Sequence, residues 1–340
     1  MIELPLSLIR AVAGVLVVLV AFRVARLQTK SWLGMSARFI ISIYTLCMWL
    51  SLVVYNRAEF LTSVLNKAGV GFPLPEKDYG DVCQIYAPDH PSGNAFFHVT
   101  DRIDVFVLAH SLGWFVKALL IRDLGVSWIC SVLFELIELC FAHLLPNFNE
   151  CWWDAVIFDI FGCNLLGIHA ADLVLTWLGW DKFNFVRNSL TSGSARYRFM
   201  FAAALLVGLV SMVDLNFFFL KFVLAVPTTH WISHVRTYSM ALVSAPSSME
   251  LFAWARGQAG TSFFRACPSV VVGLVALLTE LLLCYVYRDT LFVNSPPTPL
   301  WTILLVVSVV YAIGYSFVMQ RRSEKVSRKP KRVSKAQKAH

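Results

Sequence analysis

The chain has 340 residues, of which 58% are hydrophobic and 15% are charged, and its formal net charge is +8. Soluble domains carry about 25% charged residues, so this composition excludes an ordinary soluble fold and favours a membrane protein. The positive charge does not indicate a nucleic-acid groove, because much of it lies in the segment 321–340, which contains one acidic residue. We expect this segment to be a disordered cytosolic tail that touches anionic lipid headgroups.

Apolar stretches long enough to cross a bilayer recur from one end of the chain to the other. They predict an all-α, polytopic transmembrane bundle that forms one domain over residues 1–320, with nine spans or one more. The first stretch is interpreted as a retained helix and not as a cleaved signal peptide. The predicted spans are 5–24, 36–56, 104–121, 124–144, 153–179, 198–222, 232–254, 267–287 and 299–319. The weakest are 104–121 and 232–254, because both contain internal polar residues.

Residues 57–103 form the one long connection, in which four prolines argue against a regular element. Its beginning, around Ala58–Ala68, suits a short interfacial helix. By the positive-inside rule, the basic connections and the tail face the cytosol. The long connection and the loop Leu145–Trp152, which has no Lys or Arg, are then expected on the opposite face. The basic connections are Arg23–Lys30, the turn at Arg122, Lys182–Arg198 and Arg256–Arg265.

The eight cysteines form no Cys-x-x-Cys pair, and most lie within the apolar stretches. This arrangement predicts neither a disulfide framework nor a zinc site. We interpret the cysteines as small buried hydrophobic residues.

Acidic side chains crowd the part of the chain between residues 104 and 172. An ionised group within a bilayer costs several kcal/mol, so each such residue needs a partner, a cavity or a function. Glu135 and Glu138 are three residues apart and share a helix face. Two carboxylates that close cannot both ionise in a low dielectric unless a cation lies between them.

A second group of acids follows Pro146, which ends the preceding helix. Glu150 and Asp154 are expected on one face of the next helix, in its first turns. Asp159 is expected to point elsewhere, because five residues correspond to a rotation of about 140° from Asp154 on an α-helix. It would then face a different neighbour or a second ion.

The oxygen donors of this region are of the hard type that suits Ca²⁺, Mg²⁺ or Mn²⁺ better than zinc or copper. The predicted metal ligands are Glu135, Glu138, Asn147, Glu150, Asp154 and Asp159. The alternative is that Lys117 and Arg122 neutralise these acids as ordinary salt bridges. Metal binding is favoured, because six oxygen donors exceed what two cations can balance.

His110 lies within the span that precedes the acids, on the same helix face as Lys117. A neutral imidazole beside a metal cluster can take a proton from a hydroxyl group. We therefore predict that His110 is a general base. His143 and His169 are weaker candidates, since packing or interfacial solvation explains them.

Nucleotide-binding motifs are missing from the chain. It has no G-x-x-x-x-G-K-S/T loop and no G-x-G-x-x-G after a strand, which argues against a nucleotide-driven pump. It also lacks the D-G-x-x-A-R…G…D…D run of enzymes that use CDP-activated lipids. Phosphoryl chemistry is therefore predicted to proceed without an activated nucleotide donor.

Over roughly residues 36–290 the chain resembles the eukaryotic phosphatidylserine synthases of the base-exchange type. The motifs that carry the resemblance are HSLGW at 110–114, KALLIR at 117–122, ELIE at 135–138, LPNFNECWWD at 145–154 and DLNFFFLK at 214–221. The resemblance implies a multi-pass enzyme of the endoplasmic-reticulum membrane, and it suggests a homodimer. Such an enzyme uses Ca²⁺ and exchanges the headgroup of phosphatidylethanolamine or phosphatidylcholine for L-serine.

The resemblance also implies roles for individual residues. His110 would be the base that activates the serine hydroxyl for attack on the lipid phosphorus, with a phospho-His110 intermediate as an alternative. The six oxygen donors would form the metal and headgroup site. The residues expected to contact substrate are Trp114, Lys117, Arg122 and Asn164.

Two other classes of protein fit an acid-rich bundle. A cation-coupled transporter would be expected to have inverted repeats or matching broken helices in its two halves, and the sequence contains neither. A non-catalytic lipid scaffold would tolerate the substitution His110→Ala. Both remain alternatives to the enzyme.

Overall fold

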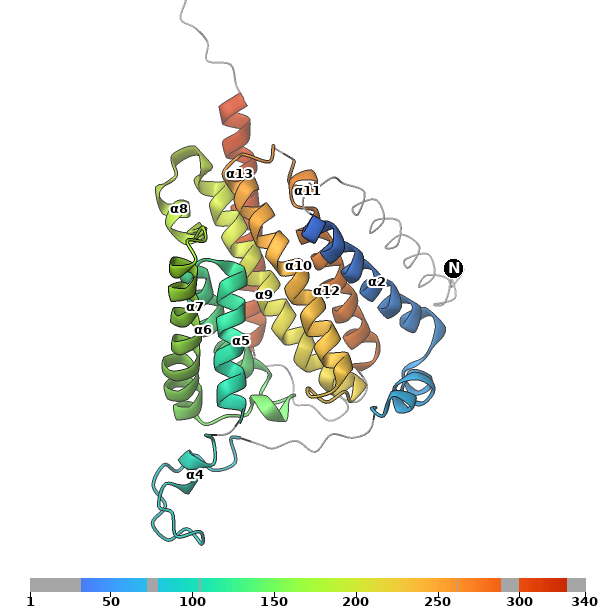
Figure 1. Ribbon diagram of the computed structural model, residues 1–340, viewed down its shortest axis with the longest axis vertical. Helices are drawn as coiled ribbons and strands as arrows, with labels where there is room; N and C mark the ends of the chain where they lie inside the picture. Colours follow the sequence, from blue (N-terminus) through green and yellow to red (C-terminus); the bar gives the residue numbers. More distant parts are fainter. Residues whose placement is uncertain (1–31, 72–78, 104, 261, 289–299, 329–340) are drawn as a thin grey trace, which may run out of the picture.

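The computed structural model describes residues 32–71, 79–103, 105–260, 262–288 and 300–328, and it forms a bundle of long helices (Figure 1). The described residues contain no β-strand. The long helices are α2 (Trp32–Val54), α5 (Val105–Ile121), α6 (Leu124–Phe141), η4 (Asp154–Asn164) continuing into α7 (Leu165–Trp177), α9 (Arg196–Leu224), α10 (Trp231–Ala255), α12 (Pro268–Val286) and α13 (Leu300–Arg328). The short elements are α3 (Arg57–Phe60), η1 (Leu61–Leu65), η2 (Asn66–Ala68), α4 (Phe97–Thr100), η3 (Pro146–Phe148), α8 (Phe185–Thr191), η5 (Gly193–Ala195) and α11 (Phe263–Ala266).

The predicted all-helical membrane class is confirmed. Every predicted span from 36–56 to 299–319 coincides with a helix, whereas the predicted span 5–24 lies outside the described residues. Among the described residues, five helices are long and apolar enough to cross a membrane by themselves: Gly34–Val54, Leu124–Phe141, Asp154–Trp177, Arg196–Leu224 and Pro268–Val286. The number of nine or ten spans stays a prediction.

Two features of the connections were partly predicted. The short helix expected at the start of the long connection is present as the consecutive elements α3, η1 and η2, and its place at the membrane interface stays a prediction. The predicted disordered tail begins too early, because α13 continues as far as Arg328. Lys and Arg have high helix propensity, so the helix of the span can extend into the basic segment. Residues 329–340 lie outside the described part of the chain.

The polar residues that weaken the predicted span 232–254 have partners inside the bundle. Arg236 of α10 donates to both carboxylate oxygens of Glu280 in α12, at 2.9 and 2.8 Å. Tyr44 of α2 donates to the same carboxylate at 2.6 Å, and Asn216 of α9 does so at 3.2 Å. A buried ion pair is tolerated when hydrogen bonds satisfy its remaining atoms. This network joins four helices and accounts for the charges without a catalytic role.

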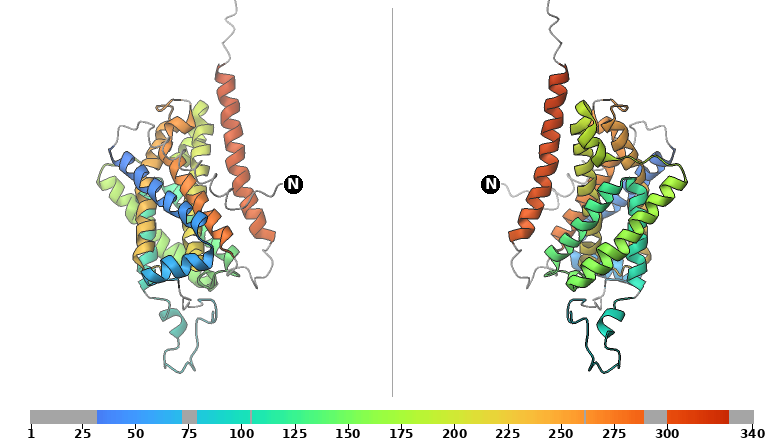
Figure 2. Two further views of the ribbon diagram at one scale, coloured as in Figure 1. Left: turned by 90° about the vertical axis from the view of Figure 1, so that its right-hand side faces the viewer. Right: turned by 90° about the vertical axis from the view of Figure 1, so that its left-hand side faces the viewer.

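The two ends of the bundle differ in the elements they carry. Figure 1 shows α8 and the C-terminal end of α13 at one end and the loop with α4 at the other. Figure 2 shows α13 along one side of the bundle, where it packs against α9. The end with α8 carries the basic connections identified in the sequence, including Arg196, Arg256 and Arg265. This is the charge distribution that the positive-inside rule describes.

Helices α5 and α7 approach very closely at Gly167. A Cβ atom added there would collide with the backbone oxygen of Ser111 and would lie 2.9 Å from the backbone nitrogen of Phe115. Only glycine fits this position without moving the helices apart. The contact holds the helix of His110 against the helix that continues from η4.

Candidate functional site

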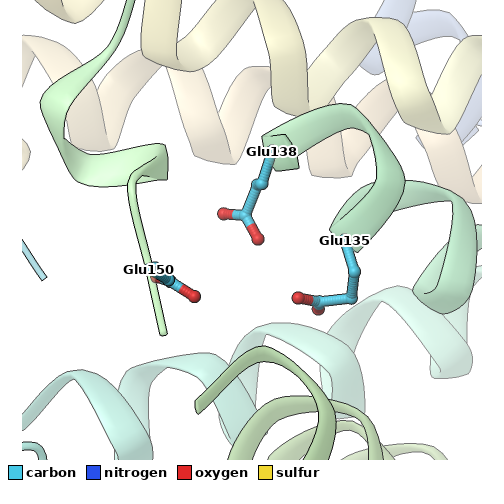
Figure 3. A group of neighbouring side chains, drawn as sticks. All are labelled: Glu135, Glu138 and Glu150. Carbon is cyan, nitrogen blue, oxygen red and sulfur yellow. The ribbon is translucent and has the colours of Figure 1, made fainter. Parts of the chain in front are cut away.

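Three glutamates converge inside the bundle. Glu135 and Glu138 lie on one face of α6, as predicted, and are 8% and 7% exposed. Glu150 reaches them from the segment between η3 and η4. One carboxylate oxygen of each residue lies within 4.8 Å of the others, and the three side chains point toward a common centre (Figure 3). We call this group the glutamate triad.

The acids after Glu150 lie on a π-helix, where an α-helix was expected. Element η4 has π-helical geometry from Asp154 to Asn164. A π-helix forms hydrogen bonds between residues five apart, so Asp154, Asp159 and Asn164 lie above one another on one face. The prediction that Asp159 turns away from Asp154 was therefore wrong. The prediction that Glu150 and Asp154 share a helix face was also wrong, because the helix begins after Glu150.

His110 faces this row of side chains from α5. Its Nδ1 atom lies 3.8 Å from Oδ1 of Asp159, and its ring packs against the edge of Phe134 with the centroids 6.4 Å apart. Its Nε2 atom is buried and has no hydrogen-bond partner among the described residues. The imidazole is thus held beside a carboxylate with one nitrogen left for a further contact.

The polar atoms without partners concentrate around the triad. Native proteins leave few buried polar atoms unsatisfied, so such a concentration calls for an explanation. Burial raises the pKa of the Glu150 carboxyl to about 8, and the charge of Asp154 adds to the shift. A divalent cation would give the unpaired oxygen atoms a partner and would stabilise the ionised carboxylates, since oxygen atoms of this kind are the ligands that Ca²⁺ takes. In this part of the described chain, the buried oxygen atoms without a hydrogen bond are Oε2 of Glu135, Oε2 of Glu138, Oε2 of Glu150, Oδ1 of Asn147 and Oδ1 of Asn164.

The alternative of ordinary salt bridges finds little support in the described residues. Lys117 pairs with Asp214 of α9 at 3.0 Å and not with the triad. Arg122 lies between α5 and α6 at the other end of these helices, where its guanidinium is 4.7 Å from the ring centroid of Trp180. Neither cation forms an ion pair with a triad glutamate.

The four residues predicted to contact substrate differ in how they lie relative to the triad. Trp114 is 1% exposed and lies in the core, with Nζ of Lys117 3.8 Å from its ring centroid. Asn164 donates to Oε1 of Glu135 at 3.2 Å, so it positions a triad carboxylate. The structure thus brings Asn164 to the triad and keeps Arg122 away from it. Lys117 and Trp114 lie next to each other on α5, C-terminal to His110.

A disulfide between Cys83 and Cys151 fastens the long connection to the segment of Glu150. The expectation that no disulfide forms was wrong, because two cysteines far apart in sequence gave no local spacing signal. Tyr79 forms an isolated bridge with Glu150, and Trp153 donates to the backbone oxygen of Cys83 at 3.1 Å. These contacts fix the position of Glu150 from outside the bundle. The long connection therefore takes part in building the site.

Removing this disulfide is expected to destabilise the protein by about 4 kcal/mol, from the entropy of closing a loop of this length. The two cysteines are 68 residues apart. A reducing agent should lower the melting temperature of the detergent-solubilised wild type but not that of a Cys83→Ser, Cys151→Ser double variant. Cys47→Ser, which alters an exposed free cysteine, serves as the control. Eight titratable thiols in the unreduced, denatured protein would contradict the disulfide.

Comparison with known proteins identifies relatives of most of the described bundle. The family model described as phosphatidyl serine synthase matches residues 28–199 and 189–288. CDP-diacylglycerol--serine O-phosphatidyltransferase 2 of Oryza sativa subsp. japonica is 34% identical over 276 residues, which cover 73% of this chain and 64% of that protein. Phosphatidylserine synthase 2 of Homo sapiens is 31% identical over 293 residues, covering 78% of this chain and 59% of the human protein. The chain spans about three fifths of the length of these relatives.

Proposed function

The chain belongs to the phosphatidyl serine synthase family, and from this premise we propose that it makes phosphatidylserine by headgroup exchange. In this reaction L-serine replaces the ethanolamine of phosphatidylethanolamine or the choline of phosphatidylcholine. The observation that carries the proposal is the buried glutamate triad, with its unpaired oxygen atoms, next to a histidine whose Nε2 is unpaired. Such a site suits phosphoryl transfer to a hydroxyl group.

The donor lipid is the point at which the relatives differ in name. The rice relative is named for CDP-diacylglycerol, whereas the human one is named only as a phosphatidylserine synthase. The present chain lacks the D-G-x-x-A-R…G…D…D run of enzymes that use CDP-activated lipids. Exchange of one phosphodiester for another is close to thermoneutral and needs no activated donor. We therefore favour a phospholipid with an amino-alcohol headgroup as the donor.

We propose calcium as the cofactor, because the oxygen donors suit a hard divalent cation and the family resemblance implies Ca²⁺. Glu135, Glu138 and Glu150 would hold the ion, with Asn147, Asp154 and Asp159 completing the oxygen-rich surroundings. Bound there, Ca²⁺ would neutralise negative charge on the phosphate oxygens of the donor lipid.

His110 is proposed as the general base. Its Nε2 takes the proton of the serine hydroxyl while a bond forms between the serine oxygen and the lipid phosphorus. The bond from phosphorus to the headgroup oxygen breaks, and the same proton passes from His110 to the departing alcohol. Asp159, 3.8 Å from Nδ1, stabilises the imidazolium that exists between these transfers. Retention of configuration at a chiral phosphorus would favour the alternative with a phospho-His110 intermediate.

Two features support a proposal for the side of the membrane on which the site opens. Disulfides persist in oxidising compartments, and Cys83–Cys151 lies at the triad's edge. The basic connections lie at the opposite end of the bundle. We propose that the protein resides in the endoplasmic-reticulum membrane with the triad toward the lumen, as a homodimer.

The proposed function is tested with purified protein in vesicles, labelled L-serine and Ca²⁺. We expect labelled phosphatidylserine when the vesicles contain phosphatidylethanolamine or phosphatidylcholine. Product formed only from CDP-diacylglycerol would overturn the exchange reaction. Absence of product with all three donors would favour the cation-coupled transporter or the non-catalytic lipid scaffold.

A further inference from the structure

Arg102 is a buried cation at the edge of the glutamate triad that neither the sequence motifs nor the proposed mechanism uses. It follows α4 in the long connection and is 8% exposed. Nη2 donates to the backbone oxygen of Tyr79 at 2.6 Å, and the guanidinium lies 4.9 Å from the ring centroid of the same tyrosine. Since Tyr79 also pairs with Glu150, these contacts hold Arg102 beside the triad.

The remaining nitrogen atoms of Arg102 are unsatisfied. Nε and Nη1 are buried and have no hydrogen-bond partner among the described residues. Nε lies 3.9 Å from Oδ2 of Asp154, which is an ion-pair distance but too long for a hydrogen bond. A buried guanidinium with unmet N–H groups is costly unless an acceptor completes it. A charged N–H group of this kind forms a short, strong hydrogen bond to a carboxylate or a phosphate oxygen.

The two reactants in the proposed exchange each carry anionic oxygens. The lipid contributes its phosphodiester, whose negative charge a cation held by the triad would neutralise. Serine contributes its α-carboxylate. Serine and ethanolamine share the amino-alcohol frame and differ in this carboxylate. Among the cations described around the triad, Lys117 is already engaged by Asp214, which leaves Arg102 to receive it.

We propose that Arg102 binds the α-carboxylate of L-serine through Nη1 and thereby makes the site prefer serine over ethanolamine. This inference rests on the proposed function, because it assigns one reactant of that reaction to a residue.

The test compares two acceptors on Arg102→Gln in the full-length protein. Labelled L-serine and labelled ethanolamine are each exchanged into phosphatidylcholine vesicles with Ca²⁺. We expect the KM for serine to rise roughly 10- to 100-fold, as for loss of hydrogen bonds to a charged group, while the KM for ethanolamine stays within twofold. Arg102→Lys keeps the charge but loses the planar guanidinium, so its KM for serine should lie between those of the wild type and Arg102→Gln. Arg57→Gln, at the same end of the bundle, is the matched control and should leave both constants unchanged.

Two outcomes overturn the assignment. An equal loss with both acceptors would mean that Arg102 serves the phosphodiester or only the local structure, and unchanged serine kinetics would mean that it serves neither. Calorimetric binding of L-serine to the wild type and to Arg102→Gln separates this inference from the proposed function. Serine binding that weakens in the variant supports Arg102 even if no exchange is observed, whereas a wild type that binds no serine contradicts it.

Discussion

Replacing His110 with alanine is expected to lower the rate of serine incorporation by about 100- to 10,000-fold. The reason is that a serine hydroxyl is a poor nucleophile until its proton is removed. His110 offers the buried Nε2, which has no partner among the described residues, while its Nδ1 lies 3.8 Å from Asp159. The measurement is the initial rate of labelled phosphatidylserine formation at saturating serine and Ca²⁺. The KM for the donor lipid should change little, because the imidazole acts on the proton in transfer and not on the lipid.

The matched control is His169→Ala on α7. His169 is exposed and packs against Trp128, with ring centroids 5.9 Å apart, so its loss should leave the rate within twofold. Equal melting temperatures of the two variants would show that neither has lost its fold. If His110→Ala exchanged serine at the wild-type rate, His110 would not be the general base.

Asp159→Asn is expected to lower the rate of serine exchange less than His110→Ala does. The substitution keeps the shape of the side chain but removes the charge 3.8 Å from His110 Nδ1. We expect a smaller loss of rate than for His110→Ala, because the base remains while its protonated form is less stabilised. A larger loss than that of His110→Ala would assign Asp159 mainly to the metal.

Much of the fold could be predicted because the bilayer imposes simple constraints. Apolar stretches of about 20 residues become helices, since every backbone polar group must be satisfied within the segment. The same reasoning located Glu135, Glu138 and Glu150, whose presence among apolar residues required a function or a partner. The weak span 232–254 was also a helix, because Arg236 found its partner in Glu280 of α12.

What could not be predicted depends on backbone geometry or on contacts between distant segments. An α-helix was assumed for residues 154–164, whereas the five-residue spacing of Asp154, Asp159 and Asn164 matches the hydrogen-bond spacing of a π-helix. That spacing was visible in the sequence and could have been used. The pairing of Cys83 with Cys151 and the arrival of Arg102 at the triad leave no local pattern, because both depend on how the long connection folds back.

Exchange activity is expected to be lost when Ca²⁺ is removed with a chelator and to return when Ca²⁺ is restored. In Glu138→Gln the Ca²⁺ concentration for half-maximal rate should rise by at least 10- to 100-fold, the loss that substitutions next to metal ligands already cause. The substitution is nearly isosteric and removes one negative charge from the triad. Direct Ca²⁺ binding, measured by calorimetry on the same protein, should weaken by a similar factor.

The control for charge is Asp172→Asn, which removes an acid that pairs with Lys182 at 2.6 Å, away from the triad. Its Ca²⁺ dependence should match that of the wild type. Because burial disfavours ionised carboxylates and close carboxylates repel, a triad without a cation gains stability when one charge is removed. Glu138→Gln should therefore raise the melting temperature in chelator and lower it, relative to wild type, in millimolar Ca²⁺. The same change of melting temperature under both conditions would mean that the three glutamates bind no ion.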